Sequence, residues 1–175
     1  MKILGLDPGT ATTGWAIIEC NEKNIVPIAY NHIQTSANLS FSDRLEQIYN
    51  ELAEIINTYK PDVAAVEQLF FAKNVKTAVS VGHARGVMLL TIKQAGIKSF
   101  EYTPLQVKQA IVGYGKAEKI QVQIMVKNIL KLKSIPKPDD TADALAIALC
   151  HKQREKWNRL QVAVTESATR KHITI

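Results

Sequence analysis

The sequence predicts an α/β domain in which a mixed five-stranded sheet is flanked by helices. Three observations support this fold class: three strand-like segments near the N-terminus, two further apolar strand segments that each follow a helical stretch, and a helical pattern in the last third of the chain. The chain has 175 residues and is 46% hydrophobic, which suffices for one packed core. We expect a single domain over residues 1–157 and a polar, weakly patterned C-terminal tail over 158–175.

The expected elements alternate in a simple order. Strands are predicted at 2–7, 12–20, 25–35, 63–68 and 98–103. Helices are predicted at about 40–60, 74–95, 104–112, 117–132 and 140–156. Ser40 or Ser42 can cap the first helix, and Pro61 ends it.

The order of these elements narrows the topology. Three antiparallel strands that lead through a helix into a parallel strand describe a mixed sheet with helices on its faces. This is the strand order of ribonuclease H-like folds, which the pattern alone leaves as one option among several.

Composition limits the function classes. The net charge of +6 is compatible with a polyanionic partner such as a nucleic acid. No apolar stretch reaches the roughly 18–20 residues that span a bilayer, and the N-terminus lacks the pattern of a secretory signal, so we expect no membrane partner. Cys20 and Cys150 form no close pair and are interpreted as buried thiols of a reducing compartment.

Acidic residues stand at the ends of two predicted strands. Asp7 ends the first strand and Glu67 ends the fourth, and ligands collect beyond the carboxyl ends of parallel strands in such sheets. Downstream, Asp140 and Asp143 are three residues apart and share one face at the start of an apolar helix. Asp139 is interpreted as a helix cap. Asp7 alone would serve as a turn former, and Glu67 alone as a buried or surface acid; together with Asp140 they indicate a shared site.

The residue types indicate a hard cation at that site. Neighbouring carboxylates repel each other, and a divalent cation removes that cost. Oxygen ligands without any histidine or cysteine ligand spacing favour Mg²⁺, with Mn²⁺ as a substitute, over zinc. Such a centre can activate water for phosphoryl transfer and stabilise the leaving oxygen. The four histidines are interpreted as structural or surface groups.

Five segments, in order, resemble the RuvC family of bacterial Holliday junction resolvases. They are GLDPGTATTGWAII, VEQLFFAKN, GHARGV, QVKQAIVGYGKAEKIQVQ and DDTADALAIAL. The likeness covers about residues 2–152. It implies a ribonuclease H-like fold, a homodimer, a requirement for Mg²⁺, and symmetric nicking of two opposing strands of a four-way DNA junction. It further implies the RuvA and RuvB branch-migration proteins as partners and a bacterial cytoplasmic location. The family's four acids fall on Asp7, Glu67, Asp140 and Asp143.

Basic residues flank the expected site. Lys108, Lys116 and Lys119 bracket the Gly113–Gly115 loop and the start of the next helix, where they can contact phosphates. The resemblance supports Lys108 and Lys119 as site residues. It also matches Phe70 to a family aromatic that stacks on an unpaired base near the crossover.

Further DNA contacts are expected after the fourth strand. Gln68 and Asn74 are candidate polar readers beside Phe70, and Lys76 and Arg85 lie on the helix that follows. Phe71 is assigned to the core. Three lysines are assigned to the solvated surface: Lys127, Lys131 and Lys133.

Three other functions fit the sequence less well. An actin-like ATPase or sugar kinase needs a second Asp-x-Gly hairpin and a Gly-Gly adenosine loop, whereas this chain has one Asp-x-Gly, at Asp7–Gly9, and no Gly-Gly pair. A non-catalytic junction-binding module has no need of four retained acids. Another ribonuclease H-like nuclease, acting on RNA or RNA–DNA hybrids, is less consistent with Phe70 and the glycine-lysine motif.

Overall fold

The computed structural model describes the backbone of residues 1–69 and 75–171 and the side chains of residues 1–69 and 78–155. Its five strands form one sheet in the order β3-β2-β1-β4-β5. The strands are β1 (Lys2–Asp7), β2 (Thr12–Cys20), β3 (Ile25–Gln34), β4 (Val63–Glu67) and β5 (Lys98–Tyr102). β1, β2 and β3 pair antiparallel, while β4 pairs parallel with both β1 and β5. The mixed ribonuclease H-like sheet predicted from the sequence is confirmed.

Five helices surround the sheet. They are α1 (Phe41–Tyr59), α2 (Val75–Gln94), α3 (Pro104–Val112), α4 (Lys119–Ile129) and α5 (Asp139–Lys171). Ser40 caps α1 as expected, because its hydroxyl accepts a hydrogen bond from the backbone N–H of Asp43 at 3.2 Å. The α1 helix ends at Lys60, whose φ of 49° is left-handed, directly before Pro61.

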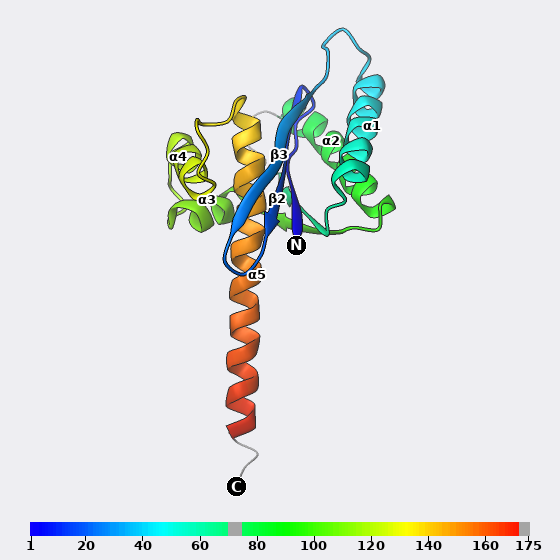
Figure 1. Cartoon of the computed structure of the whole chain (residues 1–175). Coiled ribbons are helices and arrows are strands. Elements are labelled where there is room, and N and C mark those ends of the chain that lie inside the picture. The colour runs from blue at the N-terminus through cyan, green and yellow to red at the C-terminus, as the bar shows by residue number, and fades with distance from the viewer. Residues whose placement is uncertain (70–74, 172–175) are drawn as a thin grey trace.

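The last helix differs from the sequence expectation. The sequence predicts a helix over about 140–156 and leaves the polar tail after Trp157 unassigned. Instead, α5 continues without a break to Lys171 and projects well beyond the sheet (Figure 1). Among the described residues, no helix has the length and apolarity needed to cross a membrane.

The alternation of side chains along β1 assigns its two faces. Ile3 packs in the core layer that contains α5, whereas Leu4 and Leu6 pack in the layer that contains α1 and α2. Because alternate residues share a face, Gly5 and Asp7 point to the α5 side together with Ile3.

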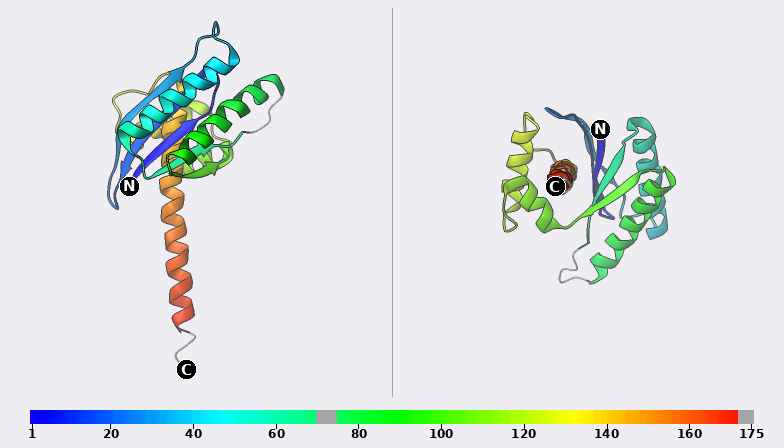
Figure 2. Two further views of the ribbon diagram at one scale, coloured as in Figure 1. Left: turned by 90° about the vertical axis from the view of Figure 1, so that its right-hand side faces the viewer. Right: turned by 90° about the horizontal axis from the view of Figure 1, so that it is seen from below.

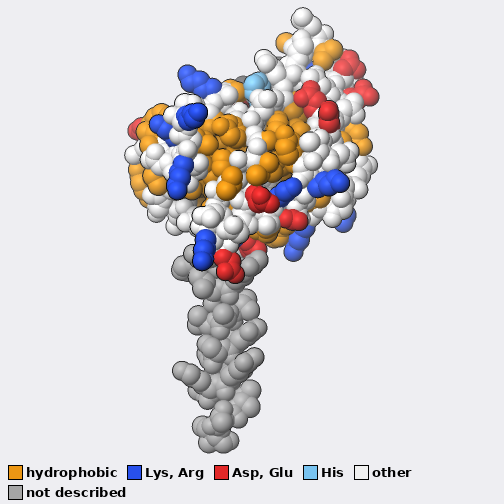
Figure 3. Space-filling model, viewed as in Figure 1, with side chains coloured by type: hydrophobic (Ala, Val, Ile, Leu, Met, Phe, Trp, Pro, Cys, Tyr) orange, Lys and Arg blue, Asp and Glu red, His pale blue; other side chains and the backbone are white. Residues whose placement is uncertain are grey.

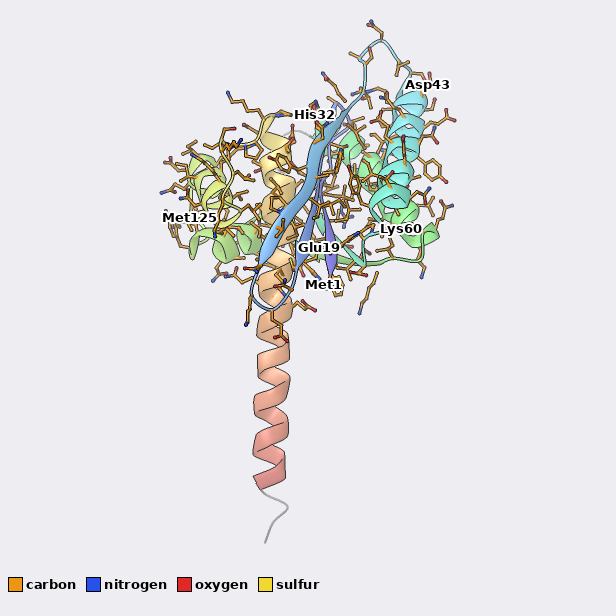
Figure 4. The ribbon with its side chains drawn as sticks, viewed as in Figure 1. Met1, Glu19, His32, Asp43, Lys60 and Met125 are labelled. Atoms are coloured by element: carbon orange, nitrogen blue, oxygen red, sulfur yellow. The ribbon has the colours of Figure 1, made fainter. Side chains whose placement is uncertain are left out.

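The helices form two layers, one on each face of the sheet. Figure 2 shows α1 and α2 covering one face, while α3, α4 and α5 cover the other. Figure 4 makes the separation visible through Met125 on α4 and Asp43 on α1, which lie on opposite sides of the strands. Tyr102 ties β5 to α5, since its hydroxyl lies 2.7 Å from Nδ1 of the buried His151.

Candidate active site

The parallel pairing of β1 with β4 brings two acidic residues side by side. Leu6 is in register with Val66, so the next residues, Asp7 and Glu67, are neighbours at the carboxyl ends of their strands. Ala65 belongs to the same core layer as Ile3, which places Glu67 on the α5 face as well. The pair expected from the sequence is therefore assembled by the sheet itself.

The N-terminus of α5 closes over these strand ends. Asp7 pairs with Gly14 across β1 and β2, and a Cβ built on Gly14 would collide with the backbone carbonyl of Asp140. This close approach requires glycine and brings the first turn of α5 onto the sheet beside Asp7. Asp143 lies on the same turn of α5 and is largely buried, with 27% of its side chain exposed.

Burial and repulsion act together on the strand-end acids. Burial, followed by the charges of Glu67, Asp143 and Asp140, raises the pKa of Asp7 well above its ordinary value. Burial, followed by the charge of Asp143, raises the pKa of Glu67 to about 7, while a hydrogen bond with Asp7 acts in the opposite direction. The charges of Glu67, Asp143 and Asp140 all act on Asp7, so the four predicted acids lie near one another at this end of the sheet.

Two lysines face this cluster from α3 and α4. A cavity of about 200 Å³ lies over Glu67 and Asp143, and Lys108 and Lys119 line it. The ammonium of Lys119 lies 2.9 Å from Oδ2 of Asp143. Burial also raises the pKa of Asp143, against the opposing hydrogen bond and charge of Lys119. A carboxylate cluster with cations at its rim is suited to receive a phosphate.

Arg85 has a different setting from the one expected. It forms an ion pair with Glu101, and its Nε donates to the backbone carbonyl of Glu67 at 3.2 Å. These contacts hold the end of β4 in place. A role of Arg85 in DNA binding stays a prediction.

The structure describes some of the remaining predicted DNA-binding residues and leaves others out. Gln68 follows Glu67 directly and donates its backbone N–H to the carbonyl of Tyr102 at 2.8 Å. Lys116 is exposed in the loop before α4. Phe70 and Asn74 lie outside the described residues, and so does the side chain of Lys76.

The donor set of the cluster fits a hard divalent cation. Its members offer carboxylate oxygens alone, the ligands that Mg²⁺ and Mn²⁺ favour. Burial, and after it the repulsion between the carboxylates, raises the pKa of Asp7 and of Glu67, and a bound cation would relieve that repulsion. Among the described residues, however, no three His, Cys, Asp or Glu side chains stand close enough to hold an ion in the present arrangement.

Sequence reasoning missed three contributors to this site. Gly14 was quoted within a motif without a role, although a glycine opposite Asp7 in a hairpin strand is a signal of close backbone approach. The Arg85–Glu101 pair carried no sequence signal. Asp139 was interpreted as a cap, yet its Oδ2 lies 3.4 Å from Nζ of Lys119.

The fold and the acidic cluster define a nuclease of the ribonuclease H-like class. The family model described as crossover junction endodeoxyribonuclease RuvC matches residues 3–151. The chain belongs to this RuvC family.

Relatives and solved structures agree with that assignment. The chain is 54% identical over 160 residues to a RuvC of Ruminiclostridium cellulolyticum, covering 91% of this chain and 96% of the relative. It is 56% identical to a RuvC of Halothermothrix orenii, with the same two coverages. The RuvC structure of Thermus thermophilus superposes with a TM-score of 0.84 at 34% identity, covering 90% of this chain and 97% of that one. The same protein in complex with a Holliday junction substrate gives a TM-score of 0.86 at 34% identity, with 90% and 96% covered.

Proposed function

We propose that this chain resolves four-way DNA junctions by paired, symmetric nicks. The observation that carries the proposal is the convergence of Asp7, Glu67, Asp140 and Asp143 on one face of the sheet. Membership of the RuvC family and the likeness to a relative described in complex with a Holliday junction support the choice of substrate.

The acidic cluster is proposed to bind Mg²⁺, for which Mn²⁺ would substitute. Asp7, Glu67, Asp140 and Asp143 would hold the ion, which when bound supplies activation of water and neutralisation of charge on the phosphate. The rigid ends of β1 and β4 fix the first two carboxylates, and the first turn of α5 fixes the others. Arg85 supports Glu67 by binding its backbone carbonyl.

The DNA backbone is proposed to lie over α3 and α4. On the face shown in Figure 3, lysine and arginine side chains lie over α3 and α4 as well as on the opposite side of the molecule, whereas acidic side chains gather over α1. Lys108, Lys116 and Lys119 would contact phosphates, which supplies affinity without reading sequence. Gln68, at the end of β4, would meet the nucleotides next to the cut.

A further group of proposed contacts follows β4. The family resemblance supports base stacking by Phe70 and polar or phosphate contacts by Asn74 and Lys76. Arg85 would contribute its remaining donor groups near the end of β4.

The two cuts require two active sites, so we propose a homodimer with two-fold symmetry. The outer face of α2 suits the interface, because Val79 is 52% exposed and Leu90 is 55% exposed. His83 and Gly86 are exposed between them at helical spacing. Nothing within 4 Å faces a Cβ built on Gly86, which leaves room for a partner helix.

Ala84, a small residue of the same helix, does not belong to that outer face. It is fully buried in the core layer between α2 and the sheet. Its small size serves packing within the subunit.

Family resemblance extends the proposal to partners and location. RuvA and RuvB would supply branch migration of the junction. The protein would act in the bacterial cytoplasm, where the DNA lies.

The proposal is tested by substrate choice. Purified protein is incubated with labelled four-way junction, linear duplex or RNA–DNA hybrid of the same sequence, with Mg²⁺ or with EDTA. We expect symmetric nicks in the junction alone, and only with Mg²⁺. Equal cleavage of the hybrid would favour another ribonuclease H-like nuclease, and binding without cleavage of the junction would favour a non-catalytic module.

A further inference from the structure

Lys119 bridges two carboxylates of one helix face. Its Nζ lies 2.9 Å from Oδ2 of Asp143 and 3.4 Å from Oδ2 of Asp139. Asp139 and Asp143 are four residues apart, so they stand one turn from each other on the same side of α5. The ammonium thus connects the start of α4 to the start of α5.

The position of Lys119 within α4 does not itself favour a positively charged side chain. It is the first residue of α4, where the partial positive charge of the helix N-terminus disfavours a positive side chain. The two α5 carboxylates are therefore what stabilises the ammonium at this point. Burial lowers the pKa of Lys119, but the hydrogen bonds and charges of Asp143 and Asp139 outweigh it and raise that pKa overall.

The two carboxylates differ in their surroundings. Asp143 lines the cavity over Glu67 and is 27% exposed, whereas Asp139 is 60% exposed and lies at the rim. Asp143 belongs to the cluster proposed to bind the metal ion. Asp139 is not part of that cluster. Its contact with Lys119 is an ion pair between α5 and α4.

We propose that Asp139 is a positioning residue that keeps Lys119 at the site when a divalent cation takes Asp143. This inference rests on the proposed metal site. In the metal-free form, Lys119 is the internal counter-cation of Asp143. A divalent cation at Asp143 would neutralise its charge. The ammonium of Lys119 would then pair with Asp139, one helical turn away, where it stays within reach of a DNA phosphate. Asp139 thereby lowers the cost of opening the Lys119–Asp143 pair.

A double-mutant cycle on metal affinity tests this role without any use of activity. The dissociation constant of Mn²⁺ is measured from the electron paramagnetic resonance signal of free Mn²⁺, for the wild type, Asp139→Asn, Lys119→Ala and the double variant. Glu22→Gln, which removes an exposed charge from the turn between β2 and β3, is the control. Thermal unfolding of each variant establishes that it is folded.

The inference predicts a specific coupling between the two substitutions. Asp139→Asn should weaken Mn²⁺ binding about two- to fivefold, the range expected for one exposed ion pair. Lys119→Ala should tighten binding, because the competing cation is gone. In the Lys119→Ala background, Asp139→Asn should leave the dissociation constant unchanged. Asp139→Glu, which keeps the carboxylate, should restore most of the affinity.

Other outcomes separate this inference from the proposed function. An equal loss in both backgrounds would mean that Asp139 acts on the metal through its own charge, and no loss in either would remove its role; both overturn the inference and leave the metal site intact. Mn²⁺ binding that survives Asp7→Asn would remove the proposed metal site, and the inference with it.

Discussion

Gly14 of β2 lies directly against the backbone carbonyl of Asp140, at a separation that leaves no room for a Cβ. Gly14 is also the strand partner of Asp7. One glycine therefore sets the distance between the strand-end acids and the acids of α5. Gly5 repeats the arrangement one turn further along α5, where an added Cβ would collide with the backbone carbonyl of Ala144.

Replacing Gly14 should separate the two halves of the site. Gly14→Ala forces α5 away from β2, and we expect a loss of about 1–3 kcal/mol in the free energy of unfolding, typical of overpacking. Junction cleavage should fall by more than stability explains, because Asp140 moves away from Asp7. Urea unfolding and cleavage of a labelled junction measure the two effects.

The control for this substitution is a helical glycine outside the proposed interface row. Gly82→Ala adds a methyl group in the interior of α2 that would lie 3.6 Å from Cδ1 of Leu69, an ordinary van der Waals distance. It should be neutral or stabilise the fold by about 0.5–1 kcal/mol. A Gly14→Ala variant as stable and as active as the wild type would disprove the close-approach argument.

Stability should depend on pH through Glu67. Its pKa is raised from 4.5 to about 7, so the folded protein keeps a proton that the unfolded chain releases over this interval. The free energy of unfolding should therefore fall as pH rises from about 4.5 to about 7, by at most about 3 kcal/mol for this group. Glu67→Gln should lack this loss, so its free energy of unfolding should rise relative to that of the wild type between pH 5 and pH 8. Urea unfolding in the presence of EDTA measures both.

Two comparisons sharpen this pH experiment. Glu22→Gln, at an exposed position, should follow the wild-type profile. Mg²⁺ should stabilise the wild type more at pH 8 than at pH 5, because the ion binds the ionised cluster. A Glu67→Gln profile parallel to the wild type would show that Glu67 is not held in a repulsive, buried setting.

DNA affinity should depend on the exposed lysine of the loop before α4. Lys116→Ala should weaken junction binding uniformly across sequences. It should also reduce the slope of the logarithm of the binding constant against the logarithm of salt concentration by about 1, as expected for one lost phosphate contact. Fluorescence anisotropy at several salt concentrations measures the slope. Lys23→Ala, exposed at the opposite end of the sheet, serves as the control. An unchanged slope for Lys116→Ala would mean that Lys116 is a solvent-exposed lysine that does not contact the DNA backbone.

The subunit interface can be tested on α2. Leu90→Arg places a charge in the exposed apolar row and should convert the dimer to a monomer in light scattering after size exclusion. Binding of Mn²⁺ should persist, because Leu90 lies outside the acidic cluster. Ile124→Arg, at an exposed apolar position of α4, should leave the dimer intact. A dimeric Leu90→Arg variant would place the interface elsewhere.

The strand-end acids were predictable because strand geometry is local. The continuous apolar run over Ile3–Leu6 predicts a buried strand that ends at Asp7, and parallel pairing with β4 follows from the intervening helix α1. The cap at Ser40 and the end of α1 before Pro61 were predictable for the same reason: each depends on neighbouring residues.

Features that depend on distant contacts were not predictable from the sequence. The pairing of Lys119 with Asp139 joins two helices across a loop, and nothing local to either residue requires it. The contact of Gly14 with Asp140 joins positions 126 residues apart. The continuation of α5 past residue 157 was not predicted because the sequence there has no clear apolar period from which a helix could be inferred.

The most direct test of the acidic centre is cleavage of a labelled four-way junction by Asp7→Asn, with Mg²⁺ present and junction binding measured in parallel. The account predicts that cleavage is abolished while binding to the junction is retained, and that Glu67→Gln behaves in the same way. Nicking at the wild-type rate by either folded variant would contradict it.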